Sequence, residues 1–301
     1  MVNGVWEGSI MKRTKENIGN QIFDVGVYFI VILITVVCFY PMLYVLFASL
    51  SNPVELMNHR GLLFAPLGIN LDGYKTVLSN ANTYVGYANT FFYVSVGTAL
   101  NLVMTVLGAY ALSRPTYWGK KFVTFLIVFT MYFNGGLIPN FLLAKNLGIL
   151  NTRLALLLPT AIGTWNLLIM RTAIRSIPPS LEEAAIIDGA DDLHTLIHVS
   201  LPLSKATLAV MFLFYAVGHW NEWFPALIYL PRARELYPLQ MFLRELLIAS
   251  VTVQEVNTEL DLSTELVKYS TIIISTVPIL CLYPFLQKYF VKGIMLGSIK
   301  G

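Results

Sequence analysis

Charged side chains are scarce in this 301-residue chain, because Asp, Glu, Lys and Arg together make up only 12% of it. A soluble globular domain usually carries about 25%, whereas 56% of these residues are hydrophobic and the mean hydropathy is +0.66. The deficit excludes an ordinary soluble domain and predicts a polytopic membrane protein. A net charge of +3, with no basic run that alternates with aromatic residues, also argues against a nucleic-acid partner.

Cysteine pairs and phosphate-binding loops are missing as well. Cys38 and Cys281 lie inside apolar runs without CxxC spacing, which predicts two small core hydrophobes rather than a disulfide or a metal pair. The run Gly119-Lys120-Lys121 lacks the upstream glycine and the hydroxyl of an ATP-binding loop. We therefore expect no metal, no cofactor and no catalytic residue in this chain, and any ATP and Mg²⁺ must be bound by a partner.

Six apolar runs are long enough to cross about 30 Å of hydrocarbon at about 1.5 Å per residue. They cover residues 25–50, 87–112, 122–144, 154–170, 206–230 and 269–291. The first run is too long for a cleavable signal, and no small-residue cleavage site follows it. The sequence thus predicts an all-α, six-helix transmembrane domain over residues 25–291, flanked by terminal segments 1–24 and 292–301.

Basic residues predict the orientation of these six spans. If the N-terminus is cytoplasmic, twelve of the 20 Lys and Arg residues fall on the inner side and eight on the outer side. Half of the outer residues lie in or directly after one long loop, 231–267, where the positive-inside rule counts least. We therefore expect both termini and the loop 176–203 to be cytoplasmic.

The loop 176–203 is polar and acidic within an apolar chain. Ser180 stands three residues before Glu183, the spacing of a capping box, which predicts a helix from Leu181. That helix should end near Gly189, because glycine adopts the left-handed conformation without strain. A second short helix should run from Asp191 to about residue 199 and stop at Pro202.

This loop resembles the EAA loop of ABC importer permeases, through Glu183-Ala184-Ala185, Gly189 and the Leu201-Pro202 end. The resemblance implies the type I importer fold and a coupling helix that sits in a cleft of a cytoplasmic ATPase, where Glu183 pairs with a basic residue. The residues expected at that contact are Glu182, Glu183, Ala184, Ala185, Asp188, Gly189, Ala190, Leu201 and Pro202.

Through two further segments, the chain resembles one class of ABC importer permeases in particular, the carbohydrate, maltose-type class. Gly135-Gly136-Leu137-Ile138-Pro139 should break the third run near its outer end. It is similar to a segment of the lipoprotein-associated polysaccharide permeases. The ending is similar to the tail of maltose-type permeases that enters the ATPase interface, with Lys292, Gly293, Gly297 and Lys300 at the matching positions.

Polar side chains interrupt the fifth run at Gly218-His219-Trp220-Asn221-Glu222-Trp223-Phe224-Pro225. Such residues are costly in a membrane, so they should face the bundle interior or a wet cavity, either bonding between helices or contacting substrate. Indole rings beside amides and carboxylates suit a sugar. The candidate substrate-pathway residues are Tyr132, Asn134, Trp165, Trp220, Asn221, Glu222 and Trp223.

The outer loop 231–267 carries mixed charge around an amphipathic stretch at residues 239–248. In the resembling family this loop meets the extracytoplasmic solute-binding protein. The alternative is a solvated loop that lies over its own membrane helices.

Together these features predict one permease subunit of an ATP-driven sugar importer in the bacterial cytoplasmic membrane. The implied partners are a homologous permease, two ATPase subunits, a solute-binding protein, a sugar and membrane lipid. Three alternatives stay open: a permease for a non-sugar solute, a membrane-embedded enzyme that uses His219 and Glu222, and a non-transporting scaffold. His219 and Glu222 supply two metal ligands at most, so a zinc site is not expected.

Overall fold

The structure is a computed structural model that describes residues 18–114, 118–253, 266–282, 284 and 287. Every regular element in this described part of the chain is helical, as the composition predicts. The four tail residues of the ATPase prediction, within 292–301, lie outside it. The longer helices are α1 (Ile18–Leu50), α4 (Ala81–Phe92), α5 (Thr98–Ser113), α6 (Lys120–Tyr132), α7 (Leu137–Asn146), α9 (Thr164–Arg175), α13 (Lys205–Trp220), α15 (Leu239–Val253) and an unlabelled helix Leu266–Leu282.

Shorter elements connect these helices. They are α2 (Pro53–Asn58), α3 (Asp72–Ser79), the π turn η1 (Tyr93–Gly97), α8 (Leu154–Leu157), α10 (Pro179–Ile187), α11 (Asp192–Thr195), the π turn η2 (Leu196–Ser200), α12 (Leu201–Leu203), α14 (Trp223–Tyr229) and the 3₁₀ turn η3 (Arg234–Leu236). The helix that carries the second predicted span starts at Ala81, six residues before the predicted start, and continues through η1 to Ser113.

Three of the six predicted runs are not single helices. The run 122–144 divides into α6 and α7, which meet at 117°. The run 154–170 divides into α8 and α9, and the run 206–230 divides into α13 and α14. Among the described residues, two helices, Phe23–Leu50 and Ala81–Ser113, are long and apolar enough to cross a membrane, and the number is up to four if each of two bent pairs forms one span. The count of exactly six spans thus stays a prediction.

Each interruption has a local backbone cause. Gly136 stands before α7 with φ +91°, a conformation that residues with a Cβ rarely adopt, and this confirms the predicted break. Pro159 cannot donate a backbone hydrogen bond between α8 and α9. Pro225 likewise offers no N–H to the carbonyl of Asn221, so the chain leaves helical geometry between α13 and α14.

The core lies where α5 packs on α9 and α13. One buried cluster joins the ends of α5 and α9 to Leu196, and it consists of Val106, Ala109, Tyr110, Leu112, Leu167, Met170, Ile174 and Leu196. A second cluster surrounds Tyr93 and includes the buried face of α15. The amphipathic stretch of the outer loop therefore covers its own helices: Leu239 and Leu243 are buried, and burial raises the pKa of the nearby Tyr237 hydroxyl.

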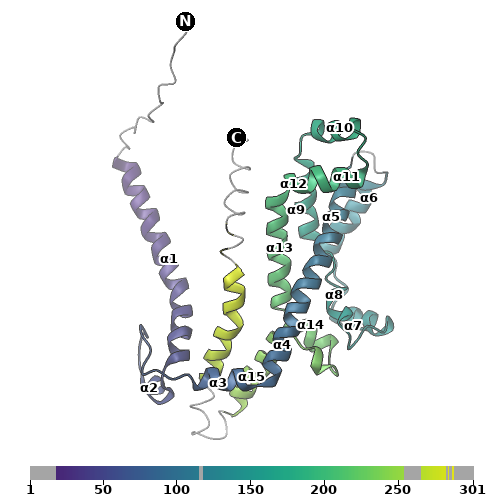
Figure 1. The fold of residues 1–301 in the computed structure, drawn as a ribbon. Coiled ribbons are helices and arrows are strands. Elements are labelled where there is room, and N and C mark those ends of the chain that lie inside the picture. Colours follow the sequence, from purple (N-terminus) through teal and green to yellow (C-terminus); the bar gives the residue numbers. More distant parts are fainter. Residues whose placement is uncertain (1–17, 115–117, 254–265, 283, 285–286, 288–301) are drawn as a thin grey trace.

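Helix α1 stands apart from this core (Figure 1). The most apolar 18-residue window of Phe23–Leu50 has no buried residue. Cys38 on α1 and Cys281 near the other end of the chain are exposed, so the prediction of two core hydrophobes is wrong for the isolated chain.

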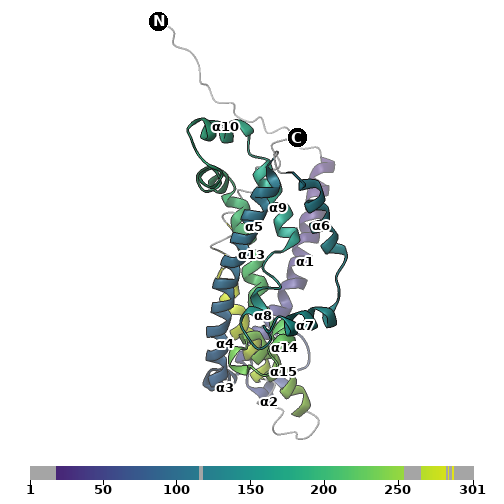
Figure 2. The same cartoon turned by 90° about the vertical axis from the view of Figure 1, so that its right-hand side faces the viewer.

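The two ends of the helix bundle are formed by different elements. α10 and α11 lie at one end, level with the start of α1, whereas α2, α3, α7, α14 and α15 gather at the opposite end (Figures 1 and 2). This separation places the polar loop 176–203 away from the loops that were predicted to be outer.

Candidate functional site

The polar loop begins with helix α10, whose first residue is Pro179. Pro178 occupies the N-cap position, and no side chain caps the helix. The predicted capping box at Ser180 is therefore wrong: proline has a preset φ and no N–H to satisfy, so it starts the helix two residues earlier than Leu181. Glu183 is consequently not used as a cap and stays exposed.

Helix α10 ends at the predicted glycine. Gly189 has φ +87°. Its N–H donates to the Ile186 carbonyl at 3.0 Å, and the Ala190 N–H donates to the Ala185 carbonyl at 2.9 Å. This is the double hydrogen bond of a Schellman motif, which needs a left-handed residue at this position. The predicted end of the helix is confirmed.

The second half of the loop is a longer helix than predicted. The Asp191 carboxylate accepts from the His194 N–H at 2.7 Å and so caps α11. Helical backbone then continues through η2 and α12 to Leu203 before an 85° bend leads into α13. Pro202 lies inside α12, so the predicted stop at this proline is wrong.

Arg114, at the end of α5, connects this loop to the helix bundle through ion pairs. Its Nη1 lies 2.5 Å from Glu182 Oε2, and both side chains are mostly buried, with 16% and 20% exposed. Its Nε lies 3.9 Å from Asp192 Oδ1, and its guanidinium stacks 4.0 Å from the centre of the Tyr110 ring. The Tyr110 hydroxyl donates to the Asp192 carbonyl at 2.8 Å. Both halves of the loop are thus held by one turn of α5.

Glu182 and Glu183 face different surroundings. Glu182 points to Arg114 and lies 3.5 Å from the Ser200 hydroxyl, whereas Glu183 and Ala184 are exposed. Three apolar side chains of α10 are also exposed, Leu181 by 45%, Ile186 by 59% and Ile187 by 85%. An acidic and apolar surface that no described residue of the chain covers is typical of a site that contacts another protein.

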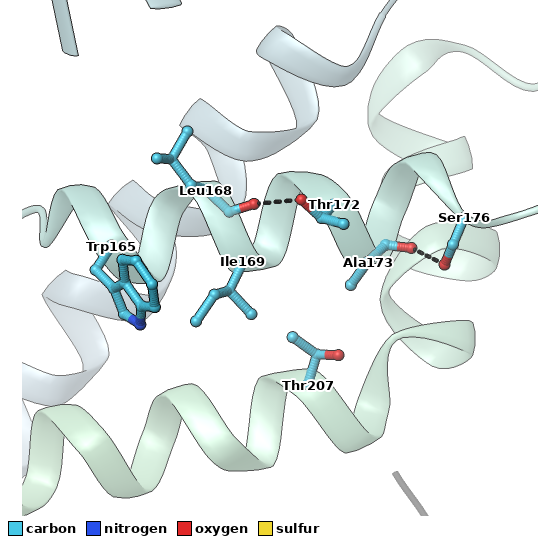
Figure 3. Close-up of a pocket in the computed structure, with 7 residues that line it drawn as sticks. All are labelled: Trp165, Leu168, Ile169, Thr172, Ala173, Ser176 and Thr207. Carbon is cyan, nitrogen blue, oxygen red and sulfur yellow. Dashed lines mark hydrogen bonds between the residues drawn. The ribbon is translucent and has the colours of Figure 1, made fainter. Parts of the chain in front are cut away.

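A groove runs between α9 and α13, and Trp165 lies at one end of it. Its volume is about 420 Å³. Its lining residues are Trp165, Leu168, Ile169, Thr172 and Ala173 of α9, Ser176 directly after this helix, and Thr207 of α13. In Figure 3, Ile169 of α9 points toward Thr207 of α13. An adjoining cavity of about 360 Å³ is lined by Arg171 and Arg175. The groove therefore offers an indole ring, hydroxyl oxygens and, at its far end, two cations.

The other predicted pathway residues do not share this groove. Tyr132 is 87% exposed at the end of α6, and Asn134 accepts from the Gly136 N–H at 2.9 Å in the turn that follows. Trp220 is buried, and its Nε1 donates to the Ser275 carbonyl at 3.0 Å, which ties α13 to the helix Leu266–Leu282.

The residues around the α13–α14 break also have partners within the chain. Asn221 is exposed and donates to the Val217 carbonyl of its own helix at 2.9 Å. Glu222 is buried and faces His219, and Trp223 stacks with the Arg244 guanidinium at 4.3 Å. The aromatic and polar residues from His219 to Trp223 therefore make several separate contacts and do not form one cluster.

Sequence reasoning missed Arg114 and Asn101. Arg114 is one of the twelve basic residues predicted on the inner side, and its place directly after the second predicted span suits a contact with a neighbouring loop. Asn101 is 1% exposed and lies in the first turn of α5, inside the second predicted span. A polar residue inside an apolar run was the available signal, since such residues must find a partner in the membrane.

Comparison with known proteins defines the class. The chain belongs to the family described as the binding-protein-dependent transport system inner membrane component, whose model matches residues 92–296. It is therefore an ABC transporter permease, a transport subunit without catalytic activity.

Individual relatives are similar over nearly the whole chain. The polygalacturonan/rhamnogalacturonan transport system permease protein YtcP of Bacillus subtilis (strain 168) is 38% identical, over 94% of this chain and 99% of its own. Protein LplC of the same organism is 39% identical, over 87% and 89%. A chain of a bacterial ABC transporter involved in the import of the acidic polysaccharide alginate has a TM-score of 0.82 and 34% identity, over 92% and 99%.

Proposed function

We propose that this chain is one permease subunit of an ATP-driven importer for fragments of acidic polysaccharides. It works in the bacterial cytoplasmic membrane with both termini in the cytoplasm. The observation that carries the proposal is the exposed face of α10, which is rigidly held by α5 and projects from one end of the bundle.

The loop 176–203 couples ATP hydrolysis on the ATPase to movement of the permease. An ATPase subunit receives Leu181, Ile186 and Ile187 in a cleft and pairs a basic residue with Glu183, while ATP and Mg²⁺ stay on that subunit. Because Arg114 and Tyr110 hold the loop, movement of α10 is passed to α5 rather than absorbed by the loop. The tail residues Lys292, Gly293, Gly297 and Lys300 add a second contact to the same partner.

A homologous permease completes the channel. Helix α1 buries none of its most apolar window in its own chain, so its surface is available to lipid and to a second permease. A solute-binding protein docks at the opposite end of the bundle, near α15, and delivers the sugar.

The groove between α9 and α13 is the part of the pathway that receives the sugar. Trp165, 62% exposed, stacks on a sugar ring, and the hydroxyls of Thr172 and Thr207 bond to it. Arg171 and Arg175 then attract its carboxylates. The relatives named for polygalacturonan, rhamnogalacturonan and alginate support an acidic sugar over a neutral one.

Uptake into proteoliposomes tests this proposal. Vesicles that hold the full assembly with its binding protein should import an oligogalacturonide in an ATP-dependent manner, and a neutral glucan of equal length at least about tenfold more slowly. Trp165→Ala should lower oligogalacturonide uptake by about tenfold, since one stacking contact is worth about 0.5–1.5 kcal/mol beyond its buried area.

Trp118→Ala is the matched control, because Trp118 is 94% exposed and lines neither the groove nor the adjoining cavity. Equal import of the neutral glucan would exclude the acidic substrate. Wild-type rates in Trp165→Ala would exclude the groove as the sugar site.

A further inference from the structure

A buried histidine and glutamate face each other where α13 ends. His219 is 3% exposed and Glu222 is 7% exposed. His219 Nδ1 lies 3.0 Å from Glu222 Oε2, and His219 Nε2 lies 2.7 Å from Asn101 Oδ1 on α5. Gly97 packs so closely that a Cβ there would lie 2.5 Å from His219 Nε2. The imidazole is therefore enclosed by protein on the α5 side.

The orientation of the Asn101 amide follows from its second contact. Its Nδ2 donates to the Thr160 carbonyl, so its Oδ1 is the atom that faces His219. Both ring nitrogens of His219 consequently face oxygen atoms. A neutral imidazole has one N–H donor and one lone pair, so it cannot donate in both directions.

Two arrangements satisfy these contacts. Either the imidazole carries both protons beside an ionised carboxylate, or a neutral imidazole donates from Nε2 while a protonated Glu222 donates to Nδ1. In both arrangements the pair binds one proton more than a neutral histidine beside a carboxylate. In both arrangements its net charge is zero, which suits a site that is withdrawn from water.

We propose that His219 and Glu222 hold one shared proton and act together as a positioning unit that braces the α13–α14 break against α5. Through Asn101 and Thr160 the unit also reaches the segment between α8 and α9. The unit thus connects the α13–α14 break to the segment that precedes α9, the main helix of the groove, so loss of the proton would leave an uncompensated buried charge between them. This inference rests on the proposed function only for its transport readout.

Neighbouring ionisable groups already have other partners. The Tyr93 hydroxyl of η1 donates to the Leu236 carbonyl at 2.8 Å, and the Tyr87 hydroxyl of α4 donates to the Ile274 carbonyl at 2.7 Å. Arg153, before α8, donates to Asn89 Oδ1 at 3.1 Å and stacks with Phe92. Glu222 thus relies on His219, and the proton belongs to this pair.

Spectroscopy of the purified full-length chain tests the proton directly. At about pH 8, where an ordinary histidine with a pKa of about 6.5 is neutral, ¹⁵N NMR should show both nitrogens of His219 protonated. Alternatively, infrared spectra should show a protonated carboxyl band that Glu222→Gln removes. A His219 with one proton, on Nδ1, beside an ionised Glu222 would overturn the proposal.

Transport by the assembled importer provides the second test. Glu222→Gln keeps a donor toward Nδ1 and mimics the protonated carboxyl, so uptake should stay within about twofold of wild type at every pH from about 6 to about 9. Glu222→Ala should lower uptake at least about tenfold while the subunits still assemble. Glu55→Gln on exposed α2 is the matched control.

The possible failures are distinguishable. No uptake by the wild-type assembly would count against the proposed function and leave the spectroscopic test standing. Wild-type uptake with an inactive but assembled Glu222→Gln would overturn the proposal, because glutamine beside a neutral imidazole keeps both hydrogen bonds and the zero net charge through which the pair is proposed to act.

Discussion

At the scale of single residues, Arg114 and Glu182 hold the loop 176–203, the proposed coupling loop, against α5. Their side chains are 16% and 20% exposed and approach to 2.5 Å, so this ion pair is largely removed from solvent. A hydrogen bond to a charged group is worth about 1.5–3 kcal/mol. The neighbouring Glu183 makes no comparable contact, although the sequence presents the two glutamates as equivalent.

Charge exchange at this pair tests its role in coupling. Arg114→Glu should leave binding-protein-stimulated ATP hydrolysis in place but lower the sugar imported per ATP by about fivefold or more, because the loop then moves without α5. The double variant Arg114→Glu with Glu182→Arg should regain much of that ratio. Transport and hydrolysis measured on the same vesicles give the answer.

Ser180→Ala is the control in the same loop, since Ser180 is exposed and does not cap α10. It should change the free energy of unfolding by no more than about 0.5 kcal/mol. A double charge exchange that stays as uncoupled as Arg114→Glu alone would show that the pair does not transmit movement.

At the scale of elements, the left-handed turn at Gly189, which ends α10, sets the direction in which this helix points. Gly189 has φ +87°, and a Cβ at this position would meet nothing within 4 Å. Gly189→Ala therefore introduces no clash, and its effect is conformational, about 1–2 kcal/mol for a left-handed residue with a Cβ. We expect weaker binding of the ATPase subunit, by about tenfold, in a pull-down titration of the assembled permease pair.

Gly218→Ala provides the comparison. Gly218 is helical and also has open space around its missing Cβ, so alanine there should be neutral or stabilising by about 0.5–1 kcal/mol. Equal ATPase affinity for both variants would mean that the left-handed turn does not set the direction of α10.

At the scale of the whole molecule, the described residues of this chain leave the most apolar window of α1 unburied, so a further surface is needed to cover it. Cys38 on that helix is exposed in the isolated chain. In a Cys281→Ser background, an apolar maleimide should label Cys38 in detergent at least about fivefold more slowly once the second permease is bound. Unchanged labelling would indicate that α1 contacts only lipid or detergent in the assembly.

Some of this architecture follows from the chain alone. Low charge and long apolar runs determined an all-helical membrane protein, because no water is available in the bilayer to satisfy open backbone groups. Gly136 and Gly189 determined where two segments turn, since each position needs a conformation that glycine adopts without strain. The spacing around Glu183 marked the loop for which a contact with the ATPase is proposed.

Other features depend on segments that are distant in sequence. Tertiary structure decided that Glu182 faces inward and Glu183 outward, because only packing brings Arg114 of α5 beside the loop. It decided that Trp220 and Glu222 are buried while Trp165 lines a groove, since all three are polar or aromatic residues in apolar runs. It also set the His219 contacts, because Asn101 lies 118 residues away along the chain and its amide is oriented by a third segment.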